Sequence, residues 1–119
     1  MELGLTTLRN LTELERVLTD SHQRPVVLFK HSYTCGVSAE ALDELRTHID
    51  EHLPSLPAGY AMVTVQTHRE VSNTISERLG IRHETPQAIL VRDGRVIWSA
   101  SHFRVNAAEL QKAVAAATV

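Results

Sequence analysis

A single dipeptide, Asp93-Gly94, restricts the fold of this 119-residue chain more than any other feature of its sequence. It lies within the segment 87–101, QAILVRDGRVIWSAS, between two runs rich in apolar and β-branched residues. Asp-Gly between such runs is the strongest short-range signal for a β-hairpin, because both residues of the tight turn need positive φ. The segment therefore predicts two antiparallel strands that are neighbours in one sheet.

Upstream of this hairpin, the pattern alternates between helices and strands. Apolar residues recur at helical spacing in three segments before the hairpin and in a fourth after it, at 11–18, 35–53, 67–79 and 106–117. Compact apolar runs, typical of strands covered on both faces, lie between them at 25–31 and 60–66. The predicted order is helix, strand, helix, strand, helix, hairpin, helix.

Capping signals support three of the predicted helices. In a capping box, a small polar residue is followed three positions later by a glutamate, and the two satisfy backbone N–H groups at the start of the helix. Gly80 also stands where the third helix should end, as glycine commonly does. The predicted capping boxes are Asn10 with Glu13, Thr67 with Glu70, and Asn106 with Glu109.

This order of elements defines an α/β fold. A strand, helix, strand unit implies a right-handed parallel crossover, whereas the hairpin makes the last two strands antiparallel. The result is one mixed sheet of four or five strands with helices on both faces, the fifth being a short edge strand near Leu3 to Leu5. This is a thioredoxin-like layout, and residues 1–119 are expected to form a single domain of this kind.

Composition excludes several classes of partner. The net charge is −2 with both signs mixed along the chain, so we expect no nucleic-acid partner. Neither an export signal nor an apolar run of about 20 residues is present, so we expect no membrane partner. The chain has one cysteine and cannot form an internal disulfide. A cytoplasmic location in a reducing compartment follows as an expectation.

That cysteine, Cys35, is the candidate catalytic residue. It lies beyond the carboxyl end of the first predicted core strand, where open α/β sheets usually carry their chemistry. With Thr34 as N-cap, Cys35 falls in the first helical turn, whose free N–H groups and dipole favour a thiolate. Lys30 and His31 are near enough in sequence to add a cation. The alternative is a buried and inert cysteine.

Ser38 and the Thr85-Pro86 dipeptide indicate how such a thiol would react. Ser38 stands where a second cysteine would complete a C-x-x-C pair, so Cys35 must form mixed disulfides that an external thiol resolves. The alternative for Ser38 is a solvated helix residue, with or without a bond from its hydroxyl to the Cys35 sulfur. A thioredoxin-like fold would make Pro86 cis and place it opposite Cys35, leaving the backbone of Thr85 free to pair with an extended partner. The alternative is a trans proline that starts an edge strand.

Two segments, FKHSYTCGVS and IRHETPQAILVRDGRVIWSASH, resemble the monothiol bacilliredoxins. The resemblance spans nearly the whole chain and implies a thioredoxin fold with Cys35 as nucleophile. It also implies removal of bacillithiol, or another low-molecular-weight thiol, from S-thiolated cytosolic proteins, without a tightly bound cofactor. Bacillithiol carries a malate, whose charge the N–H groups of Gly36 and Val37, the Thr85 backbone and Lys30 are expected to meet.

One departure from the family pattern leaves other functions open. Gly36 replaces an expected proline, which makes Cys-Gly-Val-Ser similar to the Cys-Gly-Phe-Ser of monothiol glutaredoxins that hold iron-sulfur clusters. The Gly-Gly pair of those proteins is missing from this chain. A cluster or metal carrier is therefore kept as an alternative function, and a non-catalytic interaction module is another.

The histidines do not predict a metal site. His31, His83 and His102 are expected at strand ends on the Cys35 side, but their spacing matches no compact zinc signature. We expect no metal ligands among them. The four remaining histidines are predicted to be surface residues: His22, His48, His52 and His68.

Overall fold

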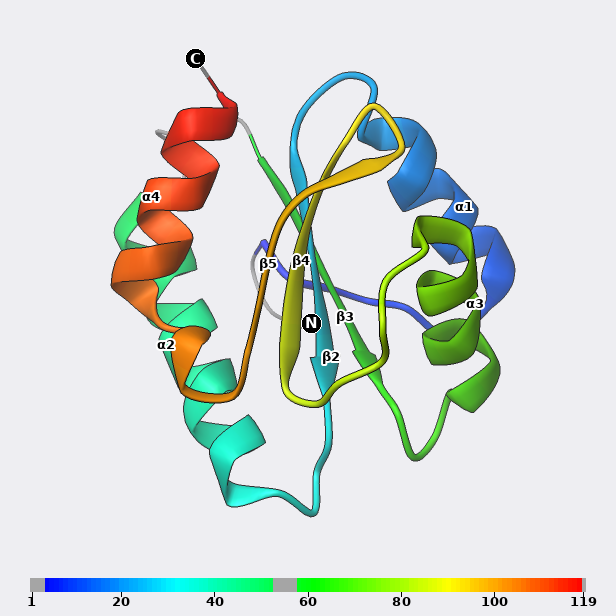
Figure 1. Cartoon of the computed structure of the whole chain (residues 1–119), viewed down its shortest axis with the longest axis horizontal. Helices are drawn as coiled ribbons and strands as arrows, with labels where there is room; N and C mark the ends of the chain where they lie inside the picture. The colour runs from blue at the N-terminus through cyan, green and yellow to red at the C-terminus, as the bar shows by residue number, and fades with distance from the viewer. Residues whose placement is uncertain (1–3, 53–57, 119) are drawn as a thin grey trace.

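The computed structural model describes residues 4–52 and 58–118, and for His52 the backbone alone. It contains five strands and four α-helices in the described residues, with a short 3₁₀ helix before the last one (Figure 1). In chain order they are β1 (Thr6–Thr7), α1 (Leu11–Asp20), β2 (Val26–His31), α2 (Gly36–His52), β3 (Gly59–Thr64), α3 (Arg69–Leu79), β4 (Gln87–Arg92), β5 (Arg95–Ser101), η1 (His102–Arg104) and α4 (Ala107–Ala117).

The five strands form one mixed sheet in the order β1-β3-β2-β4-β5. The first three are parallel, whereas β4 runs antiparallel to β2 and β5 antiparallel to β4. The predicted hairpin is confirmed, with Asp93 and Gly94 both at positive φ. In the β2–β4 pair, Lys30 lies opposite Gln87, so the segment after β2 and the segment before β4 emerge at the same end of the sheet.

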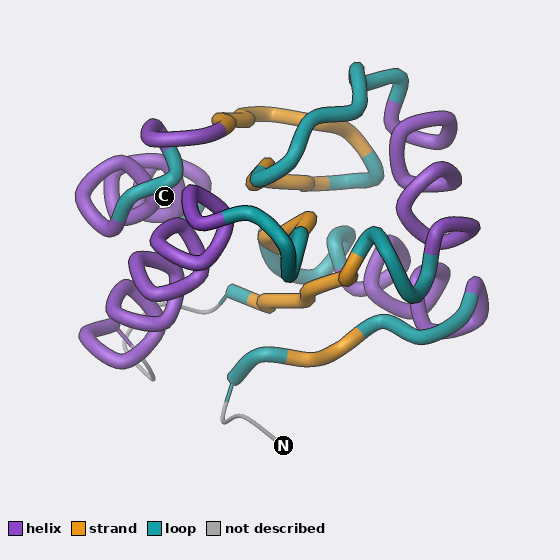
Figure 2. Tube along the Cα trace, turned by 90° about the horizontal axis from the view of Figure 1, so that it is seen from below, coloured by secondary structure: helices purple, strands orange, loops and turns teal. Residues whose placement is uncertain are grey.

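The helices cover both faces of this sheet. Figure 1 shows α2 and α4 on one side and α1 and α3 on the other, and Figure 2 shows the same layers from below. Alternate residues of a strand point to opposite faces, so Val27 and Phe29 enter the core under α2 and α4, while Val26 and Leu28 enter the core under α1 and α3. No helix within the described residues is long and apolar enough to cross a membrane.

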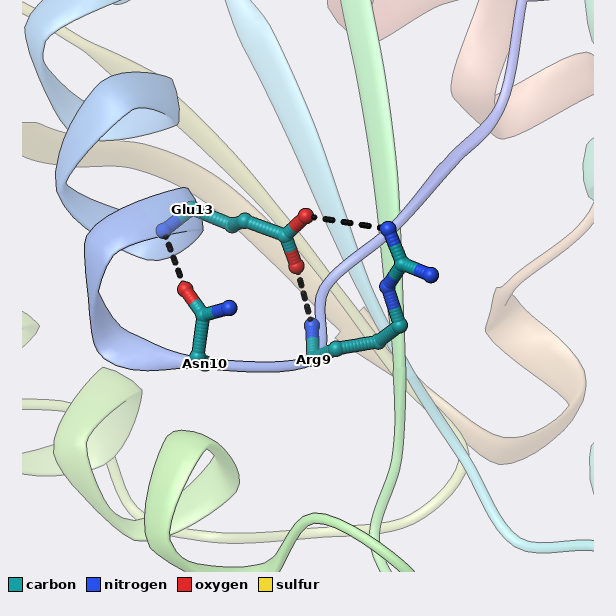
Figure 3. Close-up of polar contacts among 3 residues, drawn as sticks. All are labelled: Arg9, Asn10 and Glu13. Atoms are coloured by element: carbon teal, nitrogen blue, oxygen red, sulfur yellow. Dashed lines mark hydrogen bonds and ion pairs between the residues drawn. The ribbon is translucent and has the colours of Figure 1, made fainter.

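The start of α1 shows how a local sequence signal fixes a helix end (Figure 3). The side-chain oxygen of Asn10 accepts a hydrogen bond from the backbone N–H of Glu13 at 2.9 Å, as predicted. The carboxylate of Glu13 accepts from the backbone N–H of Arg9 at 2.7 Å and from its guanidinium at 3.3 Å. These contacts, the backbone bond first, lower the pKa of Glu13 below its usual value.

Removing this cap should destabilise the protein. We expect Asn10→Ala to lower the free energy of unfolding by about 1 kcal/mol, because the N–H of Glu13 loses its acceptor. Denaturant unfolding followed by circular dichroism measures the change. Asn73→Ala is the matched control, since Asn73 is exposed within α3. An equal loss in both variants would contradict a capping role for Asn10.

Two expectations about local structure need correction, and a third is confirmed. Helix α3 begins after His68 rather than after Thr67, whose hydroxyl bonds the carbonyl of Thr64 within the preceding turn. The edge strand is Thr6–Thr7, directly after the buried Leu5; the expected position at Leu3 lies outside the described residues. The end of α3 at Gly80, with φ of 62°, is confirmed.

His48 is fully buried, whereas the sequence predicted a surface residue. It lies on α2 beside the apolar stripe that faces β3, and its Nε2 is 2.7 Å from the hydroxyl of Tyr60. Burial raises the pKa of Tyr60 to about 12, so its hydroxyl stays protonated. A partner from another element explains why a histidine is tolerated at this depth. Of the other three histidines that were predicted at the surface, His22 is exposed and His68 is half-buried. The side chain of the third, His52, lies outside the described residues.

Candidate functional site

Cys35 lies between the end of β2 and the first residue of α2, and its side chain is partly exposed. Its backbone N–H donates to the carbonyl of Ser32 at 3.3 Å, and its own carbonyl accepts from the N–H of Ala39 at 3.1 Å. Cys35 therefore occupies the boundary position of the helix that Thr34 was expected to hold. The thiol still lies at a helix N-terminus, where backbone N–H groups favour an anion.

Ser38 is fully buried rather than solvated. Its hydroxyl oxygen accepts a hydrogen bond from the backbone N–H of Ser32 at 2.9 Å and lies 2.8 Å from Nδ1 of His31. The hydroxyl thus joins the first turn of α2 to the end of β2. The bonds that the structure gives to this hydroxyl run to Ser32 and His31, not to the sulfur of Cys35.

His31, one of the two cations that the sequence analysis offered to Cys35, faces α2. Burial lowers its pKa below the usual value, and the nearby charge of Arg46 lowers it further. A neutral imidazole can accept a hydrogen bond from the Ser38 hydroxyl at Nδ1. His31 therefore contributes to the shape of the turn before Cys35.

Lys30 points to the opposite face of the sheet from His31, because neighbouring residues of a strand alternate. It is fully buried, and its ammonium donates to the hydroxyl of Ser76 at 2.7 Å and lies 3.0 Å from Nδ1 of His83. The sequence analysis placed this cation near Cys35. The structure places it between β2, α3 and the loop that follows α3.

Gln66 is a site residue that the sequence analysis missed. It follows β3, and its side-chain amide donates to the hydroxyls of Ser32 at 2.6 Å and Thr34 at 3.2 Å. Its carbonyl oxygen accepts from the backbone N–H of Tyr33 at 3.3 Å. The signal that could have found it is its position after the strand parallel to β2, because parallel strands end at the same edge of a sheet.

The Thr85-Pro86 peptide bond is cis, as the sequence analysis expected. Pro86 is buried, and its carbonyl accepts a hydrogen bond from the N–H of His102 at 3.0 Å. The side chain of Gln87 holds the preceding loop by donating to the carbonyl of Arg82 at 3.0 Å. Thr85 therefore lies at the end of the sheet from which Cys35 also emerges.

A groove of about 360 Å³ adjoins the first turns of α2. One wall is α2 from Val37 onward and the other is η1 with the start of α4. Phe103 on this wall is 72% exposed and Tyr33, in the turn before Cys35, is 63% exposed, so large aromatic surfaces lie on two segments of this end of the molecule. Neither aromatic residue was singled out from the sequence.

The three candidate histidines do not come together. His31 bonds Ser38 on the α2 face, His83 bonds Lys30 on the α3 face, and His102 is exposed in η1. No group of three or more histidine, cysteine, aspartate or glutamate side chains in residues 4–52 and 58–118 is arranged to hold a metal ion.

A lone, partly exposed cysteine at a helix N-terminus, with a cis proline at the same end of the sheet, calls for comparison with thiol-dependent proteins. The family described as monothiol bacilliredoxin BrxC matches residues 6–110. The chain belongs to this family. Membership agrees with the serine at position 38 and makes the chain a thiol oxidoreductase.

Solved structures confirm the thioredoxin fold of this bacilliredoxin family member. A protein provisionally assigned as an oxidoreductase with a thioredoxin fold is 27% identical, with a TM-score of 0.81 over 92% of this chain and 93% of that one. Thioredoxin from Fasciola hepatica is 18% identical, with a TM-score of 0.74 over 94% and 98%. Thioredoxin from Malassezia sympodialis is 16% identical, with a TM-score of 0.76 over 100% and 96%.

Proposed function

We propose that this chain removes a low-molecular-weight thiol, bacillithiol, from mixed disulfides on proteins. The Cys35 thiolate attacks the bacillithiol sulfur of the adduct, forming a Cys35–bacillithiol disulfide and releasing the protein thiolate. A second bacillithiol thiolate then attacks the bacillithiol sulfur of that disulfide, which releases Cys35 and forms bacillithiol disulfide. The observation that carries this proposal is the single, partly exposed cysteine at the start of α2 in a bacilliredoxin family member.

The geometry around Cys35 supports both steps. The N–H groups of Gly36 and Val37, in the first turn of α2, are available to the thiolate and to a negatively charged adduct. Thr34 and Ser38, through the bonds described above, fix the turn that carries the thiol. The backbone of Thr85 is placed to pair with an extended segment of the partner protein.

The cycle needs no tightly bound cofactor, because the electrons come from the second thiol. Its substrates are S-thiolated cytosolic proteins, and its co-substrate is bacillithiol or another small thiol of a bacterial cytoplasm. A reducing compartment keeps the single cysteine available for attack. Neither nucleic acid nor a membrane takes part in this function.

Competition between thiol adducts tests the substrate class. One carrier protein with a single exposed cysteine is converted separately to its bacillithiol, glutathione and cysteine mixed disulfides, and release of the free carrier is followed by mass spectrometry. We expect the bacillithiol adduct to be released fastest, by about tenfold, because its charged malate adds contacts near the helix N-terminus. Enzyme whose Cys35 is blocked with iodoacetamide is the control.

The possible results separate the parts of the proposal. Equal rates for all three adducts would retain thiol exchange and reject bacillithiol as the preferred thiol. Release no faster than with the blocked enzyme would reject the exchange function itself.

A further inference from the structure

A buried lysine lies behind the proline loop and has no role in the cycle proposed above. Lys30 is in the middle of the sheet and fully buried. Its neighbours on the α1 and α3 face include the apolar Leu28 and Val63 and, directly opposite on β4, the buried Gln87. Burial lowers the pKa of Lys30 to about 8, which shows that the surroundings disfavour its charge. An apolar residue of similar length would fill this position at lower cost.

Among the described residues, the ammonium of Lys30 has two hydrogen-bond partners, one on a helix and one on a loop. The hydroxyl of Ser76 is on α3, within a regular helix. His83 is on the loop between Gly80 and the first residue of β4, two positions before Thr85, and is itself exposed. The bond from Lys30 to Nδ1 of His83 therefore joins the central strand to the loop that presents Thr85 and Pro86.

This bond requires a neutral His83. Nδ1 can accept from an ammonium only when the ring carries its proton on Nε2. Burial lowers the pKa of His83, and the charges of Lys30 and Arg69 lower it further, whereas Glu84 raises it. The effects that lower this pKa favour the neutral ring, the form that can accept at Nδ1.

We infer that Lys30 is a positioning residue for thiol exchange, which holds His83 and thereby sets the Thr85 backbone against the partner that Cys35 attacks. The inference rests on the proposed function. The inference gives Lys30 a role that is separate from activation of the thiol. The ammonium of Lys30 lies on the α3 face of the sheet, whereas α2 and the turn before Cys35, which is bonded to α2, lie on the opposite face. The bond also gives the ammonium of Lys30 a partner at a position that otherwise suits an apolar side chain.

Two reactions of Cys35 distinguish positioning from thiol activation. Exchange with a thiolated protein uses the Thr85 backbone, whereas alkylation by iodoacetamide needs the thiolate alone. We expect Lys30→Met to slow exchange by about tenfold, the effect of losing a charge-assisted bond. Alkylation should change by less than about twofold. Ser72→Ala is the matched control. Ser72 is buried on α3, the helix that carries Ser76, and its hydroxyl has no hydrogen-bond partner within the described chain.

A second variant tests the inference independently, in case Lys30→Met does not fold. His83→Ala alters an exposed loop residue and should slow exchange to the same extent. Because Lys30 acts through His83, the double variant should be no slower than either single variant. Fully additive losses would overturn the inference, as would loss of alkylation in proportion to exchange, or no loss of exchange in either single variant.

The pH dependence gives a readout that a packing role would not produce. The His83 bond is absent below the pKa of His83, forms as the ring loses its proton, and weakens above about 8 as the ammonium of Lys30 is lost. The ratio of wild-type to Lys30→Met exchange rates removes the pH effects that both proteins share. This ratio should rise as the pH passes the pKa of His83 and fall above about 8. A ratio independent of pH would contradict the inference.

Nuclear magnetic resonance separates failure of this inference from failure of the proposed function. The His83 ring should titrate at higher pH in Lys30→Met than in the wild type, and the amide signal of Thr85 should shift while that of Cys35 stays in place. These measurements need no exchange activity. Unchanged His83 and Thr85 signals would overturn the positioning role even in an active enzyme. Changed signals in an inactive wild type would reject the exchange function alone.

Discussion

Cys35→Ser should reduce release of the small thiol from a thiolated protein to the uncatalysed rate. Cys35 is the only thiol in the chain, so no other residue can form the mixed disulfide. The fold should survive, because the side chain is partly exposed and its backbone makes the bonds that join it to Ser32 and Ala39. We expect the free energy of unfolding to change by less than about 0.5 kcal/mol, as at most surface positions.

The measurement pairs an activity assay with denaturant unfolding of the same samples. Mass spectrometry of the wild type, stopped early in the reaction, should show the small thiol attached to Cys35. The serine variant should show no such adduct. Residual release above the background of the buffer would show that the chain acts without its thiol and would remove the nucleophilic role of Cys35.

Ser38→Cys should change the chemistry from one thiol to two. Positions 35 and 38 lie one helical turn apart, and both contact Ser32, which donates to the Ser38 hydroxyl and accepts from the Cys35 N–H. A thiol at position 38 should attack the Cys35 mixed disulfide before an external thiol arrives, since an intramolecular reaction has a high effective concentration. Mild oxidation should then yield an internal disulfide.

This gain has a structural cost that a control variant can isolate. The Ser38 hydroxyl is buried and bonds both Ser32 and His31, so its loss should lower the free energy of unfolding by about 1 to 3 kcal/mol. Ser38→Ala loses the same bonds without adding a thiol. A folded Ser38→Cys protein that never forms the internal disulfide would mean that the two sulfurs cannot meet, and the second position would be structural only.

The parts of the fold that the sequence predicted well depend on neighbours along the chain. The Asp93-Gly94 turn, the caps at Asn10 and Asn106 and the end of α3 at Gly80 all form from residues within a few positions of one another. Local signals of this kind are readable without knowledge of the fold. The mixed sheet with helices on both faces followed from them, because crossover and hairpin connections have fixed rules.

The parts that the sequence did not predict depend on partners distant along the chain. Lys30 was expected near Cys35, but the alternation of β2 sends it to the other face, where its partners are Ser76 and His83. His48 was expected at the surface, but it is buried, and the hydroxyl of Tyr60 is its partner there. Gln66 carries no motif at all. In each case the decisive neighbour is more than ten positions away, so periodicity and composition could not reveal it.

The bonds that join the loops around Cys35 bear on how quickly a partner can be recognised. Gln66 ties the turn before Cys35 to the end of β3, and the Pro86 carbonyl ties the proline loop to η1. Loops already held in one arrangement lose little conformational entropy when a partner docks, and the backbone of such surfaces moves little on binding. In the proposed function, loops held in this way would allow brief encounters with many thiolated proteins, and the presence of a mixed disulfide would determine which encounter leads to reaction.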